Sequence, residues 1–309
     1  MVILELIGGV LLTAAAGFLV EQLVYYFSAR LGRSTASVAM IIAPIITSSP
    51  ELAVFIIALL QGKADVAWGS IVAQPFMAST VIYPVVVITA LLSWALGRRT
   101  ARMPHVHRYV AVPLLVFTLP LIPVLLLHPQ SYRLYGRLYG LSILAVYFVY
   151  AWRALSREAE AHESPRLYLG NPALQIAASI AALYFGGGWL VSGIADMGSA
   201  LGLDETALAV LLVPVATVLP ESITGLIFIA RGRDDEGVSV IVGEKALYGT
   251  FYPGLAMALG VYTLEPAAAA ALVIAIAISL LEAVAIWRGY FGLTAPLGLA
   301  GYVWYALHV

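Results

Sequence analysis

The chain has 309 residues, of which 62% are hydrophobic and 11% are charged, and its mean hydropathy is +0.96. Soluble proteins carry about 25% charged residues, so this composition excludes an ordinary soluble domain and indicates a membrane protein with several spans. The formal net charge of −1, without a basic cluster, gives no sign of nucleic-acid binding. The absence of cysteine excludes disulfides, thiolate metal sites and iron–sulfur clusters.

Apolar runs long enough to cross a bilayer divide the chain into about ten predicted helices, and the expected fold is an all-α membrane protein. The predicted spans are residues 2–28, 35–60, 66–96, 108–127, 134–155, 172–199, 205–230, 237–263, 266–287 and 291–308. The N-terminus lacks a basic region and a small-residue cleavage site. We therefore interpret it as the first span and not as a removable signal.

Basic residues fall mainly on alternate connections between the predicted spans, and this bias indicates the orientation in the membrane. With the N-terminus outside, twelve arginines fall on cytoplasmic connections: Arg30, Arg33, Arg98, Arg99, Arg102, Arg108, Arg153, Arg157, Arg166, Arg231, Arg233 and Arg288. Only Lys63, Arg133 and Arg137 fall on the opposite side. Both termini are therefore predicted to be external.

Two segments 170 residues apart carry the same polar signature within apolar sequence. Residues 44–51 read Pro-Ile-Ile-Thr-Ser-Ser-Pro-Glu, and residues 214–221 read Pro-Val-Ala-Thr-Val-Leu-Pro-Glu. Proline removes a backbone hydrogen bond from a helix. A glutamate at bilayer depth is energetically costly, so its presence there indicates a function. We expect each segment to be a broken helix, because matching broken helices in two halves are typical of a transporter's ion site.

The same shift aligns other polar residues, since Asp65 falls on Asp235 and Thr80 on Thr250. Each half contains five predicted spans, an odd number, so the second half is expected to be inverted relative to the first. The predicted organisation is a first five-helix repeat at residues 1–155, a cytoplasmic linker at 156–171 and a second, inverted repeat at 172–309. The linker is too short for a folded regulatory domain.

Inverted repeats would place Glu51 and Glu221 opposite each other near the middle of the membrane. Two carboxylates in a dry site repel unless a cation or protons neutralise them. Hard oxygen donors from Glu, Thr and freed carbonyls suit calcium and, less exclusively, sodium or magnesium. The hydroxyls of Thr47 and Thr217 could instead bond back to carbonyls of their own helices, and this alternative stays open.

The two segments resemble those of the calcium/cation antiporter superfamily, especially its sodium/calcium exchanger branch. That family carries Gly-Thr-Ser-x-Pro-Glu in each repeat and Gly-Ser-Asn on the helix that follows. Here Ile46 and Ala216 replace the two glycines of the first motif. The resemblance covers essentially the whole chain. It implies ten helices in two inverted five-helix repeats and a transporter, not an enzyme.

The resemblance also implies that Glu51, Glu221, Thr47 and Thr217 bind the transported cation. Further candidate ligands are Ser48, Gln74 and Glu244. The second motif departs from the family pattern, since its positions hold Ala-Gln-Pro at residues 73–75 and Gly-Glu-Lys at 243–245. Gln74 can still offer a carbonyl oxygen, and Glu244 adds a third carboxylate. Tyr248 lies one turn after Glu244, where its hydroxyl could bond that carboxylate.

Lys245 brings a positive charge to this region. Three glutamates and one lysine sum to −2, which one divalent cation or two monovalent ions would neutralise. The ammonium could stand in for a bound monovalent ion and so change the coupling. Neighbouring helical residues point about 100° apart, so Glu244 and Lys245 cannot both face the site squarely.

These residues predict a secondary active antiporter that exchanges a divalent cation, with calcium as the leading candidate, for sodium or protons by alternating access. The alternatives are an antiporter of another metal such as magnesium, an intramembrane enzyme using Glu51 and Glu221 as an acid/base pair, and a passive channel. The expected partners are metal cations and the lipid bilayer, with no cofactor besides the transported ion. The oligomeric state is not predicted.

Overall fold

The computed structural model describes residues 2–61, 64–156, 166–200, 213–260 and 264–308. This part of the chain is helical apart from its connections, with one isolated β-bridge between His105 and Tyr290. The first half contains α1 (Val2–Leu31), α2 (Thr35–Thr47), α3 (Ser49–Leu60), α4 (Ala64–Met77), η1 (Ala78–Ile82), α5 (Tyr83–Ala95), η2 (Arg108–Val110), α6 (Ala111–Thr118), α7 (Leu121–Leu126), η3 (Pro129–Ser131) and α8 (Arg133–Ser156). The second half contains α9 (Pro172–Ala200), α11 (Val213–Ala230), α12 (Asp234–Ala246), η5 (Leu247–Phe251), α13 (Tyr252–Leu259), α14 (Pro266–Trp287) and α15 (Ala295–His308).

Helices occupy every one of the ten predicted spans, within the described residues. Six helical stretches in that part are each long and apolar enough to cross a bilayer, and α2 with α3 adds a seventh if the bent pair is one span. The remaining predicted spans contain charged side chains or shorter helices. The predicted fold class, an all-α membrane protein, is therefore confirmed.

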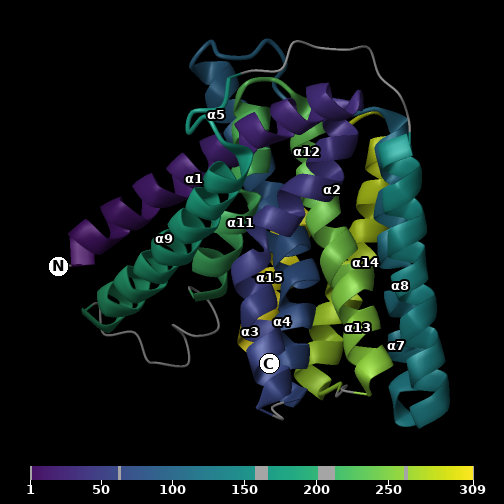
Figure 1. Cartoon of the computed structure of the whole chain (residues 1–309). Coiled ribbons are helices and arrows are strands. Elements are labelled where there is room, and N and C mark those ends of the chain that lie inside the picture. The colour runs from purple at the N-terminus through teal and green to yellow at the C-terminus, as the bar shows by residue number, and fades with distance from the viewer. Residues whose placement is uncertain (1, 62–63, 157–165, 201–212, 261–263, 309) are drawn as a thin grey trace.

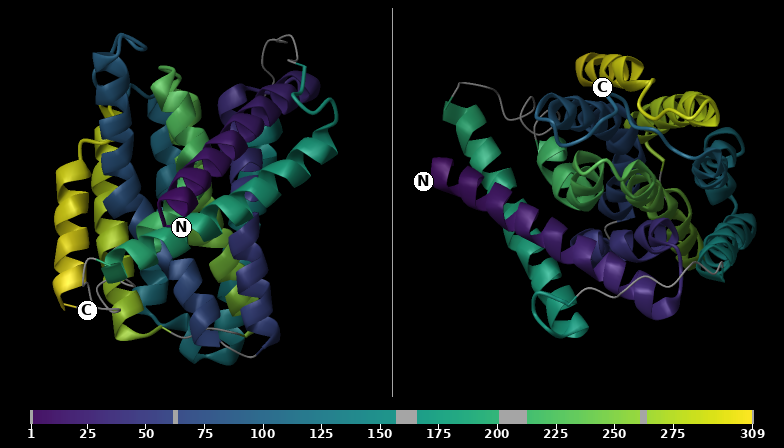
Figure 2. Two further views of the ribbon diagram at one scale, coloured as in Figure 1. Left: turned by 90° about the vertical axis from the view of Figure 1, so that its left-hand side faces the viewer. Right: turned by 90° about the horizontal axis from the view of Figure 1, so that it is seen from above.

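Helices α1 and α9 form an antiparallel pair that lies obliquely to the other helices (Figures 1 and 2). Small residues permit their close approach, as is common between membrane helices. A Cβ on Gly9 would lie 2.9 Å from the carbonyl oxygen of Gly186, and a Cβ on Gly186 would lie 2.8 Å from Thr13 Oγ1. Within the glycine run at residues 186–188, the first glycine therefore allows α9 to pack closely against α1.

The other helices form an upright bundle in which α2 and α12, from different halves of the chain, lie side by side (Figure 1). Gly243 on α12 faces the backbone of α2, and a Cβ there would lie only 1.9 Å from the carbonyl oxygen of Met40. The largest buried side chains around this bundle include Tyr83, Phe117 and Ile241. The core thus joins the two halves of the chain and does not divide into two separate units.

A wide π-helical turn interrupts the third predicted span, and a second interrupts the eighth. These turns, η1 and η5, are each followed at once by Tyr-Pro, at residues 83–84 and 252–253. Proline has no amide hydrogen to donate to the preceding turn, so the regular hydrogen-bond ladder is disturbed there. The two halves therefore repeat a structural feature as well as a sequence motif.

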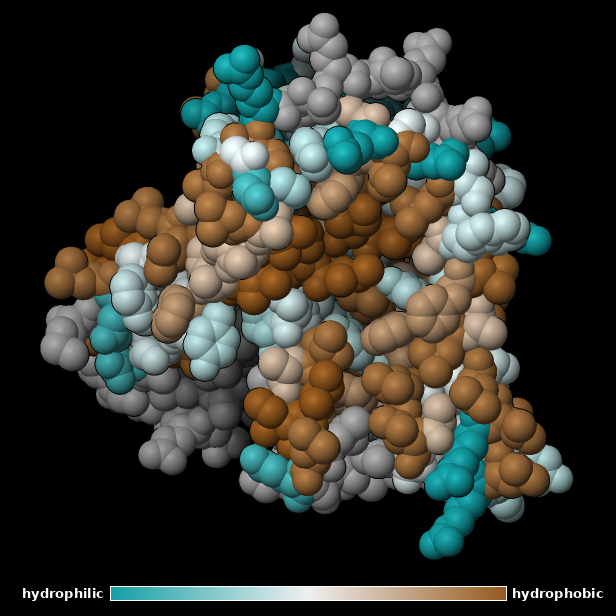
Figure 3. Space-filling view, viewed as in Figure 1, coloured by the Kyte–Doolittle hydropathy of each residue, from teal (hydrophilic) through white to brown (hydrophobic). Residues whose placement is uncertain are grey.

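Connections from both halves of the chain meet at one end of the molecule, the upper end in Figure 1. The Arg33 guanidinium donates to the carbonyl of Ser156 at 3.0 Å, and Arg99 donates to Asp234 at 2.9 Å. The backbone amide of Phe291 donates to the carbonyl of Pro104 at 3.1 Å. Figure 3 shows hydrophilic side chains at this end above a largely hydrophobic middle, as expected for a membrane-embedded bundle.

Candidate functional site

The first Pro-Glu segment breaks a helix, as predicted. Ser34 caps the start of α2 by accepting a hydrogen bond from the amide of Ser37 at 3.2 Å. Helix α2 ends at Thr47 and α3 begins at Ser49, with an angle of 50° between the two. The break places the hydroxyls of Thr47 and Ser48, which are both buried, directly before Glu51 on the first turn of α3.

The second Pro-Glu segment is different, and the prediction of a second break at this proline is wrong. Helix α11 runs from Val213 to Ala230 with Pro220 inside it. Proline removes one backbone donor but its φ angle is compatible with a helix, and membrane helices tolerate it where neighbouring groups compensate. The side chain of Thr217, a predicted cation ligand, lies outside the described residues.

Glu51 and Glu221 are brought together from the two halves of the chain. Their carboxyl groups lie close enough to interact directly, and two charged carboxylates at this separation would repel. Glu221 is 1% exposed, whereas Glu51 is partly exposed. The hydroxyl of Tyr248 donates to Glu221 Oε1 at 2.8 Å. Tyr248 therefore bonds Glu221 and not Glu244, the partner that its helical spacing had indicated.

Glu244 is also buried, and its Oε2 accepts a hydrogen bond from Ser222 Oγ at 2.8 Å. Its charge lies near enough to those of Glu51 and Glu221 for the three to repel one another. Gln74 and Glu244 line a narrow space together with Lys245 and Tyr248. The second motif of each repeat thus contributes one side chain to this region.

A cavity of about 460 Å³ leads to the glutamate pair. Its lining includes Thr47, Pro50, Glu51, Gly187, Pro220 and Glu221. The cavity passes α9 where Gly187 carries no side chain, so the glycine run serves access as well as packing. We call this space the glutamate cavity.

Several oxygens in and beside the glutamate cavity have no hydrogen-bond partner among the described residues. They are Ser48 Oγ, Glu51 Oε2, Glu221 Oε2 and Glu244 Oε1. Buried oxygens are rarely left without partners, because the desolvation is costly. The hydroxyl of Thr47 donates its proton to the carbonyl of Ala43 at 3.2 Å. The lone pairs of Thr47 Oγ1 therefore remain to accept from, or bind to, a group in the cavity.

This donor set suits a hard cation. Carboxylate and hydroxyl oxygens are the ligands of calcium and magnesium. In the part of the chain that the structure describes, no three His, Cys, Asp or Glu side chains converge as a ready-made metal site. A cation here would therefore be bound by the Glu51–Glu221 pair together with hydroxyl or carbonyl oxygens, and direct binding by Glu244 and Gln74 stays a prediction.

Lys245 does not point toward these glutamates. Its ammonium donates to Ser79 Oγ at 2.6 Å, to Ser279 Oγ at 2.7 Å and to the carbonyl of Pro75 at 3.3 Å. The predicted divergence of residues 244 and 245 is confirmed, with Glu244 near the glutamate cavity and Lys245 turned toward α4, η1 and α14. The direct charge compensation expected from Lys245 within the glutamate cluster is therefore absent.

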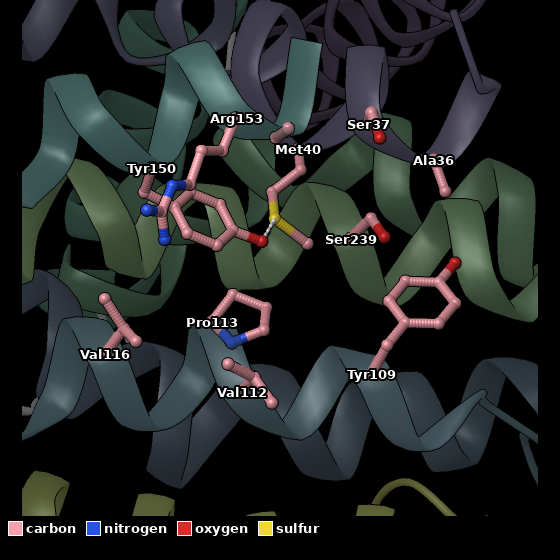
Figure 4. Close-up of a pocket in the computed structure, with 11 residues that line it drawn as sticks. Ala36, Ser37, Met40, Tyr109, Val112, Pro113, Val116, Tyr150, Arg153 and Ser239 are labelled. Carbon is pink, nitrogen blue, oxygen red and sulfur yellow. Dashed lines mark hydrogen bonds between the residues drawn. The ribbon is translucent and has the colours of Figure 1, made fainter. Parts of the chain in front are cut away.

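A second cavity, of about 280 Å³, lies between α2, α6, α8 and α12 (Figure 4). Its walls are mostly apolar, and the hydroxyl of Tyr150 donates to Met40 Sδ at 3.1 Å across it. Arg153 and Ser239 add polar groups to the lining. None of the predicted ion-binding residues faces this space, so we distinguish it from the glutamate cavity.

Sequence reasoning missed three serines that the structure places beside charged groups. Ser222 bonds Glu244, and Ser79 with Ser279 bonds Lys245. Ser222 directly follows the Pro-Glu pair, so its position in an apolar helix was a usable signal. Ser279 lies on α14, far from either motif, and only the tertiary structure connects it to the site.

Long apolar helices with paired carboxylates beside a cavity are typical of a membrane transporter for cations. A family model described as "Sodium/calcium exchanger protein" matches residues 1–155 and 172–309. The chain belongs to this family, and it is a cation antiporter and not an enzyme. The intramembrane-enzyme alternative is therefore discarded.

Solved structures of the sodium-calcium exchanger NCX_Mj share the fold. The structure soaked with 100 mM Na⁺ and 10 mM Sr²⁺ has a TM-score of 0.75 and 16% sequence identity, covering 100% of this chain and 99% of that one. The structure soaked with 10 mM Na⁺ and zero Ca²⁺ has a TM-score of 0.70 and 17% identity, covering 100% of both chains. No protein of curated function matches the chain in sequence.

Proposed function

We propose that this protein exchanges calcium for sodium or protons by alternating access, with Glu51 and Glu221 as the central ligands of the transported ion. The observation that carries the proposal is the pair of carboxyl groups that line the glutamate cavity together. A divalent cation between them would neutralise both charges and satisfy the carboxylate oxygens that have no partner among the described residues. The NCX_Mj structures, whose descriptions name sodium, calcium and strontium, agree with this chemistry for a relative of the same fold.

Calcium is favoured over magnesium by the kind of site. Calcium accepts six to eight oxygens in flexible geometry, whereas magnesium requires a near-ideal octahedron and gives up water reluctantly. The glutamate cavity combines two carboxylates with the hydroxyl of Thr47, and it leaves room for water. Magnesium transport without calcium transport would overturn this choice of cargo.

The counter-ion follows from what neutralises the carboxyl pair when calcium leaves. Two neighbouring carboxylates repel, so a proton or a monovalent cation must take the place of calcium. A proton would then be a direct competitor of calcium, and sodium ions would be competitors if they bind the same oxygens. The two couplings differ in the gradient that drives calcium movement.

The test is calcium uptake by proteoliposomes at zero membrane potential, under a sodium gradient at fixed pH and then under a pH gradient without sodium. Uptake under at least one gradient is expected. Glu51→Gln and Glu221→Gln should each abolish it while leaving a monodisperse protein, and Glu265→Gln, an exposed carboxylate, serves as the matched control. Wild-type uptake by either of the first two variants would contradict the proposed site.

We also propose that both termini face the outside of the cell, because the arginine-rich connections gather at one end of the bundle. The chain contains no cysteine, so single cysteines can report the side directly. Leu307→Cys, near the C-terminus, should react in intact cells with a thiol reagent that cannot cross membranes. Arg98→Cys should react only after permeabilisation, and the reverse pattern would invert the topology.

A further inference from the structure

Lys245 is surrounded by oxygen atoms in the interior of the bundle. The residue is 4% exposed, and its ammonium nitrogen lies 2.6 Å from Ser79 Oγ, 2.7 Å from Ser279 Oγ and 3.3 Å from the carbonyl oxygen of Pro75. The ring of Tyr83 presents its face at 5.3 Å. Oxygen atoms and an aromatic face are both favourable neighbours of a cation. We call this group the lysine cage.

The two hydroxyls of the lysine cage are oriented as acceptors. Ser79 Oγ donates to the carbonyl of Pro75 at 2.9 Å, and Ser279 Oγ donates to the carbonyl of Ala275 at 2.6 Å. A hydroxyl has one proton and two lone pairs. Ser79 Oγ also lies 3.4 Å from the carbonyl oxygen of Ala275 and 3.2 Å from Ser279 Oγ. Each hydroxyl can give its proton to a carbonyl and accept from the ammonium, so the cage suits a cation.

The lysine cage is also suited to a single positive charge. Among the described residues, Lys245 forms no ion pair with a carboxylate. Glu282 acts on it electrostatically but is itself bonded to the amides of Gly292 and Thr294, at 2.5 and 3.2 Å. A divalent ion in a cage of neutral oxygens would lack the counter-charge that a buried double charge requires.

The cage lies at a contact between equivalent positions of the two repeats. Lys245 and Pro75 are 170 residues apart, the same separation as Glu51 and Glu221. The glutamate pair and the lysine cage are thus both built where the repeats meet. In the glutamate pair, both repeats supply a carboxyl group. In the lysine cage, the first repeat supplies the carbonyl of Pro75 and the second supplies the ammonium of Lys245.

We propose that the lysine cage is a monovalent-cation site that this protein fills with its own ammonium group. The tethered cation cannot dissociate, so the site is permanently occupied and takes no part in ion exchange. It follows that the ions moved in each cycle are bound in the glutamate cavity alone. This consequence, unlike the site itself, rests on the proposed exchange function. The lysine then fixes α12 against α4 and α14 as a bound ion would.

The direct test is to empty the cage and supply a free ion. Lys245→Ala removes the ammonium and leaves space for an ion with water, whose share of liquid volume is about 30 Å³. Potassium is the probe, because its radius is close to that of an ammonium ion. The thermal midpoint of the purified protein is measured in potassium chloride and in N-methylglucamine chloride at equal ionic strength. Potassium should raise the midpoint of Lys245→Ala by about 3 °C.

The background for this test is Glu51→Gln combined with Glu221→Gln, so that ions in the glutamate cavity cannot produce the response. The same double variant with Lys245 intact should show no potassium effect. Lys245→Met, which fills the cage without charge, should show none either, and adding Ser279→Ala to Lys245→Ala should remove it. Failure of the proposed exchange function leaves all of these expectations unchanged.

An equal midpoint of the Lys245→Ala variant in the two salts would overturn the proposal and assign Lys245 a purely structural role. If Lys245→Ala does not yield folded protein, Lys245→Ser, which adds a hydroxyl to the same cage, is measured in its place. Recovery of either variant only in potassium supports the site. Failure of both in either salt counts against it, because a bound ion should rescue them.

Discussion

Gly243→Ala probes the contact that aligns the two halves of the chain beside the glutamate cavity. A Cβ at this position would lie 1.9 Å from the carbonyl oxygen of Met40 and 2.7 Å from Pro44 Cγ. Real Cβ atoms essentially never approach within 3.0 Å, so α2 and α12 must move apart by about 1.1 Å, the difference between these two distances. The obstacle is a backbone atom and cannot move aside as a side chain would.

Overpacking of this kind costs about 1–3 kcal/mol, and the backbone contact places this case toward the upper end. For a protein of this size, we expect the thermal midpoint to fall by about 5–10 °C. The same displacement separates Thr47 on α2 from Glu244 on α12. Misplacement by about 1 Å costs on the order of 100-fold in enzyme sites, so calcium uptake should fall by at least about tenfold.

The assays are thermal unfolding in detergent and calcium uptake by proteoliposomes, with the two measured on the same preparation. Gly188→Ala is the control for stability, because a Cβ there would meet no described atom within 4 Å. It should leave the midpoint unchanged or raise it slightly, since alanine favours a helix over glycine. A wild-type midpoint and wild-type uptake for Gly243→Ala would refute the packing of α2 against α12.

Three further substitutions test single contacts. Tyr248→Phe removes the 2.8 Å hydrogen bond that holds Glu221 and should weaken calcium binding about tenfold, measured by calorimetry, while transport persists. Arg99→Lys should destabilise the protein by about 3 kcal/mol, measured by thermal unfolding, because one ammonium cannot reach the four acceptors that this buried guanidinium bonds. Glu21→Gln should cost only about 1 kcal/mol in the same assay, since its partner Arg231 is 49% exposed.

The fold was predictable because the bilayer imposes a simple length rule on helices. Runs of about 20 apolar residues located the ten spans, and the structure places helices in all of them within the described residues. The wide turns η1 and η5 were not predicted, although Tyr-Pro at 83–84 and 252–253 marks both. A proline in an apolar run can either end a span or follow a wide turn within it, and the sequence alone does not distinguish these two cases.

The glutamate pair was predictable from the repeat, but its surroundings were not. Equivalent positions in inverted repeats meet near the centre of a transporter, and this brings Glu51 to Glu221. The helical angle of 100° separates Glu244 from Lys245 but does not say what each one faces. The partner of Lys245 on α14, Ser279, belongs to no motif, so its role depends on tertiary packing that no local pattern encodes.

The two halves carry matching Pro-Glu segments but differ in backbone there, because the helix breaks before Pro50 and continues through Pro220. Helix α2 ends before Glu51, which leaves that carboxylate partly exposed on the cavity, whereas α11 continues through Pro220 and keeps Glu221 buried under the hydroxyl of Tyr248. Under the proposed function, the partly exposed carboxylate would meet an arriving ion, and the buried one would receive it. Exchange of these roles between the repeats, with the first helix closing and the second opening, would carry the ion to the opposite side of the membrane.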